Sequence, residues 1–106
     1  MRGSSPSGRR SLRLRWTRLA EHDLDDIAAY IGQDSPAAAA RVVLELIDQT
    51  EALLLRHAAL GRPGRVLGTR ELVIRDLPYV IPYRVRENDI EILRVLHTSR
   101  RWPGRM

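Results

Sequence analysis

His97 is the side chain in this sequence that is best suited to acid–base chemistry. An unperturbed imidazole titrates near neutral pH, so it can both take up and release a proton. His97 ends the last predicted strand, and a groove shared with Arg84 and Arg100 would place cations beside it. The alternative is a histidine that closes a strand and hydrogen-bonds the backbone. We favour this alternative, because no acidic residue is evidently placed to orient the imidazole.

Arginine supplies all 18 of the Lys and Arg positions in the chain. Its guanidinium suits bidentate contact with carboxylate or phosphate, and it keeps its proton, so it is a poor general base. Residues 17–57 hold three Arg against eight acids, a net charge of −5, whereas residues 58–106 hold ten Arg against five acids, a net of +5. An anionic partner, nucleic acid or an acidic protein segment, is therefore expected on the C-terminal half. The candidate partner-binding residues are Arg70, Arg75, Arg84, Arg94, Arg100, Arg101 and Trp102.

For Arg84 and Arg94, an ion pair inside the protein is as strong a prediction as contact with a partner. Both lie on predicted inner strands, where a cation needs an anionic partner or an open groove. Three acids of the predicted sheet could pair with them: Glu71, Asp76 and Glu91. For the C-terminal residues 100–102 we favour a cation–aromatic binding patch over a solvated basic tail.

No metal site and no cofactor are expected. The sequence has no cysteine, which excludes a thiolate zinc site. His22 and His57 have no ligand-like spacing with each other or with His97. The first predicted helix also carries an acidic cluster that we assign to its solvated face: Asp23, Asp25 and Asp26.

Two helices precede the part of the chain that carries most of these candidates. Residues 12–16 alternate apolar and charged side chains, which predicts a half-buried strand. Apolar residues at helical spacing then predict a helix that stops at Gly32. A second helix is predicted over residues 37–57, with Ser35 as its N-cap and Pro36 at its first position. So short a link makes the two helices antiparallel neighbours.

Three strands follow a glycine-rich loop, over residues 70–75, 79–86 and 90–97. Tight turns between them predict antiparallel pairing. Pro82 inside the second run predicts an edge strand or a bulge, and the last run is apolar on both faces, which predicts a central strand. Tyr79 and Tyr83 share one strand face and are predicted to lie in the core. The order β-α-α-β-β-β predicts an α+β fold, a helical hairpin packed on a small, mainly antiparallel sheet.

One domain, residues 12–102, is expected in this chain of 106 residues. Residues 1–11 are rich in Gly, Ser, Pro and Arg, which predicts a disordered extension, either native or vector-derived, and residues 103–106 form a tail. No apolar run is long enough to cross a membrane, and the N-terminus lacks the apolar region of a secretory signal. A cytoplasmic protein without a membrane partner is therefore expected.

In this order of elements the sequence resembles the RelE/ParE superfamily of bacterial toxins from type II toxin–antitoxin pairs. The resemblance spans residues 12–102 and rests on short motifs in order: LRLRWT at 12–17, DLDDI at 23–27, GRPG at 61–64, REL at 70–72, PYVIPYR at 78–84 and ILRVLH at 92–97. It implies a toxin that a cognate antitoxin neutralises in a hetero-oligomer. RelE-like members are ribosome-dependent mRNA endonucleases, whereas ParE-like members inhibit DNA gyrase, and the fold alone does not choose between these targets.

The reactive residues of RelE-like nucleases are largely missing from the matching positions. Metal-free RNA cleavage needs a group that activates the 2′-hydroxyl, cations for the transition state and an acid for the leaving oxygen. The sequence has no lysine, which excludes the lysine-based set of such residues. The strand arginine of the other set falls near Val80, and its terminal His-Tyr pair falls near Thr98 and Ser99.

The leading hypothesis is therefore a ParE-like toxin that binds DNA gyrase. Its antitoxin would place an acidic or amphipathic tail along the helical hairpin and the basic groove. One alternative is a ribosome-dependent mRNA endonuclease that uses His97 with Arg84, Arg94 or Arg100. The other is a non-toxic member that only binds its antitoxin.

Overall fold

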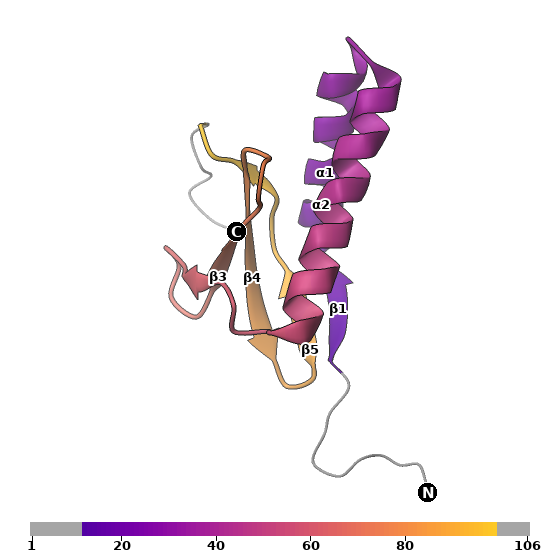
Figure 1. Ribbon diagram of the computed structural model, residues 1–106. Helices are drawn as coiled ribbons and strands as arrows, with labels where there is room; N and C mark the ends of the chain where they lie inside the picture. Colours follow the sequence, from indigo (N-terminus) through magenta and orange to yellow (C-terminus); the bar gives the residue numbers. More distant parts are fainter. Residues whose placement is uncertain (1–11, 100–106) are drawn as a thin grey trace, which may run out of the picture.

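Two antiparallel helices cover one face of a single mixed sheet in the computed structural model, which describes residues 12–99 (Figure 1). This arrangement confirms the predicted α+β class. The extension predicted over residues 1–11 and the candidates Arg100, Arg101 and Trp102 lie outside the described residues. The elements are β1 (Arg13–Trp16), α1 (Arg18–Gly32), α2 (Pro36–Arg56), β2 (Arg62–Pro63), β3 (Arg70–Val73), β4 (Tyr79–Arg86), β5 (Asp89–Ile92) and β6 (Leu96–His97).

The strand order in the sheet is β1-β5-β4-β3-β2, with β6 paired to β4 beyond the end of β5. Strands β3, β4 and β5 form the predicted antiparallel meander. The first strand, β1, pairs with β5 in parallel and closes that side of the sheet. Because β5 lies between β1 and β4, the prediction of an inner last strand is confirmed for residues 89–92.

Both helices begin at a hydroxyl side chain. The Ser35 hydroxyl accepts a hydrogen bond from the Ala38 amide at 3.1 Å, and Pro36 is the first helical residue, as predicted. Thr17, which was not predicted as a cap, accepts from the Ala20 amide at 3.2 Å. Gly32 is the last residue of α1. The caps fix where the hairpin starts and turns, and thereby which helix faces meet the sheet.

Pro82 lies in the central strand β4, so the predicted edge position is wrong and the predicted bulge is confirmed. The β4–β5 register pairs Tyr83 with Ile92, whereas the β4–β6 register pairs Val80 with Leu96, so residues 93–95 stand opposite 81–82. The Pro82 carbonyl accepts from the amide of Leu93 at 2.9 Å. The N–H and C=O of one strand residue point to the same side, so the missing N–H of proline faces the bulge, where the ladder is already interrupted.

The core lies between the hairpin and the helix-facing side of the sheet. Tyr83 is fully buried there and Tyr79 is 8% exposed, which confirms their predicted packing role. Each large apolar side chain buried in this layer contributes about 1.5–3 kcal/mol to stability. The other fully buried side chains of this cluster are Ala20, Leu46, Leu54, Ile81, Ile90 and Ile92.

Candidate functional site

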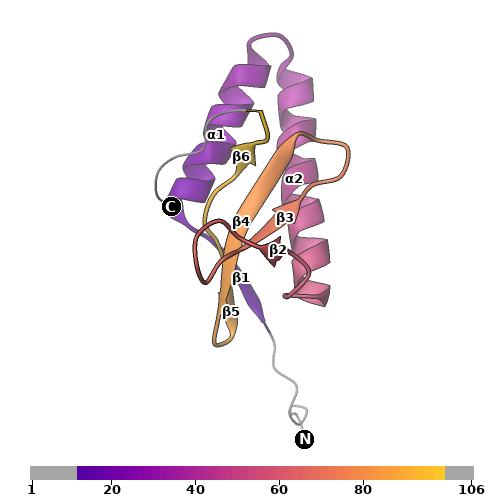
Figure 2. The same ribbon diagram turned by 90° about the vertical axis from the view of Figure 1, so that its left-hand side faces the viewer.

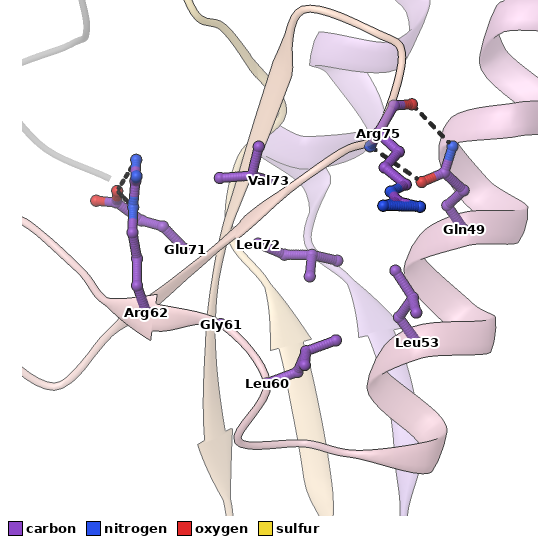
Figure 3. Close-up of a pocket in the computed structure, with 9 residues that line it drawn as sticks. All are labelled: Gln49, Leu53, Leu60, Gly61, Arg62, Glu71, Leu72, Val73 and Arg75. Carbon is purple, nitrogen blue, oxygen red and sulfur yellow. Dashed lines mark hydrogen bonds and ion pairs between the residues drawn. The ribbon is translucent and has the colours of Figure 1, made fainter.

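A groove of about 470 Å³ lies between the C-terminal half of α2 and the outer part of the sheet at β3 (Figure 3). Its walls come from α2, from the connection that follows the helix, and from β3 with the residues just after it. Figure 3 shows the helix on one side of the groove and the Arg62–Glu71 pair on the other. The lining residues are Gln49, Leu53, Leu60, Gly61, Arg62, Glu71, Leu72, Val73 and Arg75.

The edge of β3 is only partly covered along this groove. Strand β2 pairs with β3 only at Arg70 and Glu71. Beyond that pairing, the Gln49 carboxamide oxygen accepts from the Arg75 amide at 3.2 Å, and the Gln49 nitrogen donates to the Arg75 carbonyl at 3.2 Å (Figure 3). A peptide group of a neighbouring strand would make the same pair of bonds. The side chain of Gln49 thus takes the place of a strand at this position.

Charged groups stand on the rim of an apolar groove. Glu71 is 3% exposed, and its carboxylate accepts from the Arg65 amide at 2.8 Å and pairs with the Arg62 guanidinium at 3.3 Å. The Arg62 side chain stays 58% exposed. Arg75, one of the predicted partner-binding residues, is exposed at the end of β3. Leu60 and Val73, 47% and 51% exposed, supply apolar surface between these cations.

Tyr83 anchors the connection that enters the groove. Its hydroxyl donates to the Ala58 carbonyl at 2.8 Å and accepts from the Gly61 amide at 2.8 Å. Burial raises the pKa of this phenol. Gly61 is required here, because a Cβ on it would lie 2.7 Å from the Tyr83 ring.

Arg70, another predicted partner-binding residue, supports the same connection. Its guanidinium donates to the carbonyls of Ala59 and Gly61, at 3.2 and 2.7 Å.

Arg94 pairs inside the molecule with Asp23 of α1. Its guanidinium donates two hydrogen bonds to the Asp23 carboxylate, at 2.8 and 2.9 Å, and the Val95 amide donates to the same carboxylate at 2.9 Å. This bonding raises the pKa of Arg94. Internal pairing was anticipated with acids of the sheet, so the acid is corrected to Asp23. The assignment of Asp23 to the solvated helix face is wrong for the same reason, whereas Asp25 and Asp26 are exposed as predicted.

Arg84 pairs with Glu91 across β4 and β5, which confirms the internal alternative for this residue. Its Nε lies 2.6 Å from a Glu91 oxygen, and Arg15 of β1 contacts the other oxygen at 2.5 Å. The bonds from Arg84 and then from Arg15 lower the pKa of Glu91. Sequence reasoning missed Arg13 and Arg15, which lie 3.8 and 3.7 Å from Asp89. The signal was present in their alternation along β1, but only the β1–β5 pairing places them opposite acids.

His97 does not share a site with Arg84. Its ring meets Tyr79 edge-on, with 5.3 Å between ring centroids, and its Nδ1 accepts from the Ser99 amide at 3.1 Å. Arg84 lies five residues farther along β4 than the register partner of His97, a separation of about 17 Å. Between residues 12 and 99, no three His, Asp or Glu side chains are grouped to hold a metal ion. In the same part of the chain, no helix is long and apolar enough to cross a membrane.

Comparison with known proteins identifies the family. Residues 14–102 match the family model described as the ParE toxin of the type II toxin–antitoxin system parDE. A protein of Sinorhizobium fredii that is named as a toxin, Y4kP, is 52% identical over 91 residues, which cover 86% of this chain and 93% of that protein. The toxin RelE2 of Caulobacter vibrioides is 40% identical over 87 residues, which cover 80% of this chain and 93% of that one.

A solved structure extends the match to three dimensions. A chain from the chromosomal ParDE toxin–antitoxin system of P. aeruginosa superimposes with a TM-score of 0.76 at 34% sequence identity. The match covers 84% of this chain and 98% of that chain. Sequence, fold and family model thus agree over nearly the whole domain, and the chain belongs to the ParE toxin family of type II toxin–antitoxin systems.

Proposed function

We propose that this toxin arrests growth by binding DNA gyrase rather than by cutting RNA, and that a cognate antitoxin neutralises it through the groove between α2 and β3. The placement of His97 is the main argument against RNA cleavage. Its imidazole is engaged by Tyr79 and the Ser99 amide, about 17 Å along the strand from Arg84. General acid–base catalysis needs the proton-transfer group and the cations around one reacting phosphate.

The burial of Val80 also supports binding over catalysis. By resemblance, the strand arginine of RelE-like nucleases falls near Val80, which is 3% exposed in the central strand. Arg94, offered as a second cation for the nuclease alternative, is held by Asp23 on the helix side. Cleavage of mRNA is the second candidate function, because one relative is named RelE2 and the resemblance to RelE-like toxins implies this activity. A member that only binds its antitoxin is the third.

The groove fits a tail that carries both apolar and acidic residues. Apolar side chains of such a tail would cover Leu60 and Val73, each about half exposed, and burying surface of this kind contributes about 1 kcal/mol per side chain. Its carboxylates would meet Arg62 and Arg75 on the rim. A tail that is disordered when free would order on binding.

The substitution Val73→Glu tests the groove. It places a carboxylate on the groove wall, where it repels an acidic tail and removes apolar contact, while the half-exposed position leaves the core intact. We expect antitoxin binding, measured by titration calorimetry, to weaken at least tenfold, which corresponds to about 1.4 kcal/mol.

Val85→Glu is the matched control, since Val85 is 43% exposed at the far end of β4 and does not line the groove. It should bind the antitoxin as the unchanged protein does. Equal affinities for the two variants would contradict the groove as the antitoxin site.

A further inference from the structure

The face of the sheet turned away from the helices carries arginines on two strands, β1 and β4, which flank the acids of β5. Arg13 and Arg15 come from β1, and Arg84 and Arg86 come from β4, with Asp89 and Glu91 of β5 between them. We call the three that lie within 4 Å of these acids the arginine layer: Arg13, Arg15 and Arg84. Figure 2 views the molecule from this side, with β1, β5 and β4 neighbouring one another at the lower end.

Exposure divides this cluster into two levels. The side chains of Arg13, Arg15 and Arg84 are 77%, 53% and 41% exposed. The acids are more covered, Asp89 at 33% and Glu91 at 12%. The guanidinium groups therefore form the outer level, and the carboxylates beneath offset their mutual repulsion. Hydrogen bonds to Glu91 hold Arg15 and Arg84 in place, whereas Arg13 has a looser contact with Asp89 at 3.8 Å. A fixed guanidinium loses less side-chain entropy when it binds an anion.

The chemistry of this face selects among anionic partners. Single-stranded nucleic acid is bound largely by stacking on aromatic rings, and within residues 12–99 the strand residues of β1, β5 and β4 that point to this face include no aromatic residue. Asp89, one-third exposed, would also repel a phosphate backbone. Carboxylates spaced on a protein surface can each meet one guanidinium and avoid Asp89. A protein partner therefore fits better than nucleic acid.

The arginine layer is also separate from the groove. It shares no residue with the groove lining. The groove lies at β3, which is about 5 Å across the sheet from β4, the strand of Arg84, and about 14 Å from β1, the strand of Arg13 and Arg15. An antitoxin tail in the groove contacts Arg62 and Arg75, not these arginines. We propose that the arginine layer is the surface with which this toxin contacts a carboxylate-bearing face of its protein target, an assignment that rests on the proposed function by binding.

The test replaces the layer and its buried counter-ion together, because removing the arginines alone would leave the carboxylate of Glu91 unpaired. The layer variant is Arg13→Gln, Arg15→Gln, Arg84→Gln and Glu91→Gln. A control variant changes the net charge equally on the helices, and it consists of Arg18→Gln, Arg41→Gln, Arg56→Gln and Asp48→Asn. Growth arrest on induction, antitoxin affinity and thermal unfolding are measured for both, together with binding of a 20-residue polyglutamate peptide and of a 20-nucleotide single-stranded DNA.

We expect the layer variant to lose growth arrest and to bind polyglutamate at least tenfold more weakly, while its antitoxin affinity stays within threefold of the unchanged protein. The control variant should keep growth arrest. Growth arrest that survives in a folded layer variant would overturn the proposal. So would an unchanged protein that binds the DNA but not the peptide, with both DNA binding and growth arrest lost in the layer variant.

A second variant guards against misfolding and tests the geometry. Arg13→Lys, Arg15→Lys and Arg84→Lys keep every charge but remove the bidentate fork, so growth arrest should weaken at least tenfold with unfolding unchanged. Full growth arrest in this variant would overturn the role of the fixed guanidinium groups. None of these measurements uses gyrase, so they test the arginine layer independently of the target. If the layer variant loses growth arrest while gyrase is unaffected by the unchanged toxin, gyrase is rejected as the target, and the arginine layer is still the surface that contacts the target protein.

Discussion

Asp23 on α1 and Arg94 after β5 form a two-point ion pair that ties the helical hairpin to the sheet. Both Arg94 bonds are shorter than 3.0 Å, and the two side chains are only 12% and 17% exposed. The bulge opposite Pro82 makes this contact possible, because it turns both Arg94 and Val95 toward the helices. Thr17 adds a third link from the same helix end, since its hydroxyl donates to the Leu93 carbonyl at 3.2 Å.

Replacing Asp23 tests the strength of this tie. Asp23→Ala leaves the Arg94 guanidinium and the Val95 amide without their acceptor, so we expect the free energy of unfolding to fall by about 2–4 kcal/mol. Urea denaturation followed by circular dichroism measures it. Asp25→Ala, on the exposed face of the same helix, should change stability by less than about 0.5 kcal/mol. If both substitutions lower the free energy of unfolding by the same amount, the Asp23–Arg94 ion pair does not stabilise the contact between the helix and the sheet.

Tyr83→Phe tests the anchor of the groove connection. The substitution keeps the ring but leaves the buried Gly61 amide without an acceptor, which should cost about 1–3 kcal/mol. Because burial raises the pKa of Tyr83, the unfolded chain ionises first, so its contribution is complete below pH 10.0 and is lost as the pH rises above it. Across this pH range, the free energy of unfolding should fall more steeply with rising pH for the unchanged protein than for Tyr83→Phe. Identical profiles would contradict the role of the phenol.

Glu91 should make the sheet sensitive to acid. Hydrogen bonds from Arg84 and Arg15 lower its pKa below the ordinary glutamate value of 4.5, so its stabilising effect is complete above pH 4.5 and disappears as the pH falls through the folded-state pKa. Between pH 7 and pH 2, the midpoint temperature of thermal unfolding should fall less for Glu91→Gln than for the unchanged protein. Asp48→Asn, on the exposed face of α2, is the control, and its unfolding temperature should fall with acid as much as that of the unchanged protein. A Glu91→Gln profile parallel to the unchanged one would be inconsistent with these bonds.

His97→Ala separates a structural histidine from a catalytic one. Loss of the edge contact with Tyr79 should cost about 0.5–1.5 kcal/mol, and growth arrest should persist at the unchanged level of expressed toxin. The readout is colony formation after induction, with thermal unfolding to confirm that the variant folds. A folded His97→Ala protein that no longer arrests growth would favour the nuclease alternative.

Local signals were sufficient to predict most of the fold. Ser35 and Pro36 lie next to each other at a helix start, and Tyr79, Ile81 and Tyr83 alternate along one strand, so neighbouring residues carry the information. The sequence left β4 open between an edge position and a bulge, because proline removes one donor and the sequence does not show which side of the strand loses it. The bulge that accommodates Pro82 becomes apparent only when both β5 and β6 are paired with β4.

The partners of the candidate site residues were harder to predict, because they come from distant parts of the chain. Arg94 and Asp23 are 71 residues apart, and Arg15 and Glu91 are 76 apart. The second pair depends on the parallel β1–β5 register, which no turn between the strands specifies. The groove likewise forms where α2 and the partly covered edge of β3 meet, a tertiary relationship without a local sequence pattern.

Plasmid supercoiling by purified DNA gyrase, with increasing amounts of the purified toxin, tests whether the toxin acts by binding gyrase. A toxin that acts by binding gyrase should block supercoiling or trap cleaved DNA, and the cognate antitoxin should relieve the effect. The same preparation should leave translated mRNA intact in a cell-free system. Unimpaired supercoiling together with codon-specific mRNA cleavage would show that the toxin cuts RNA and does not act on gyrase.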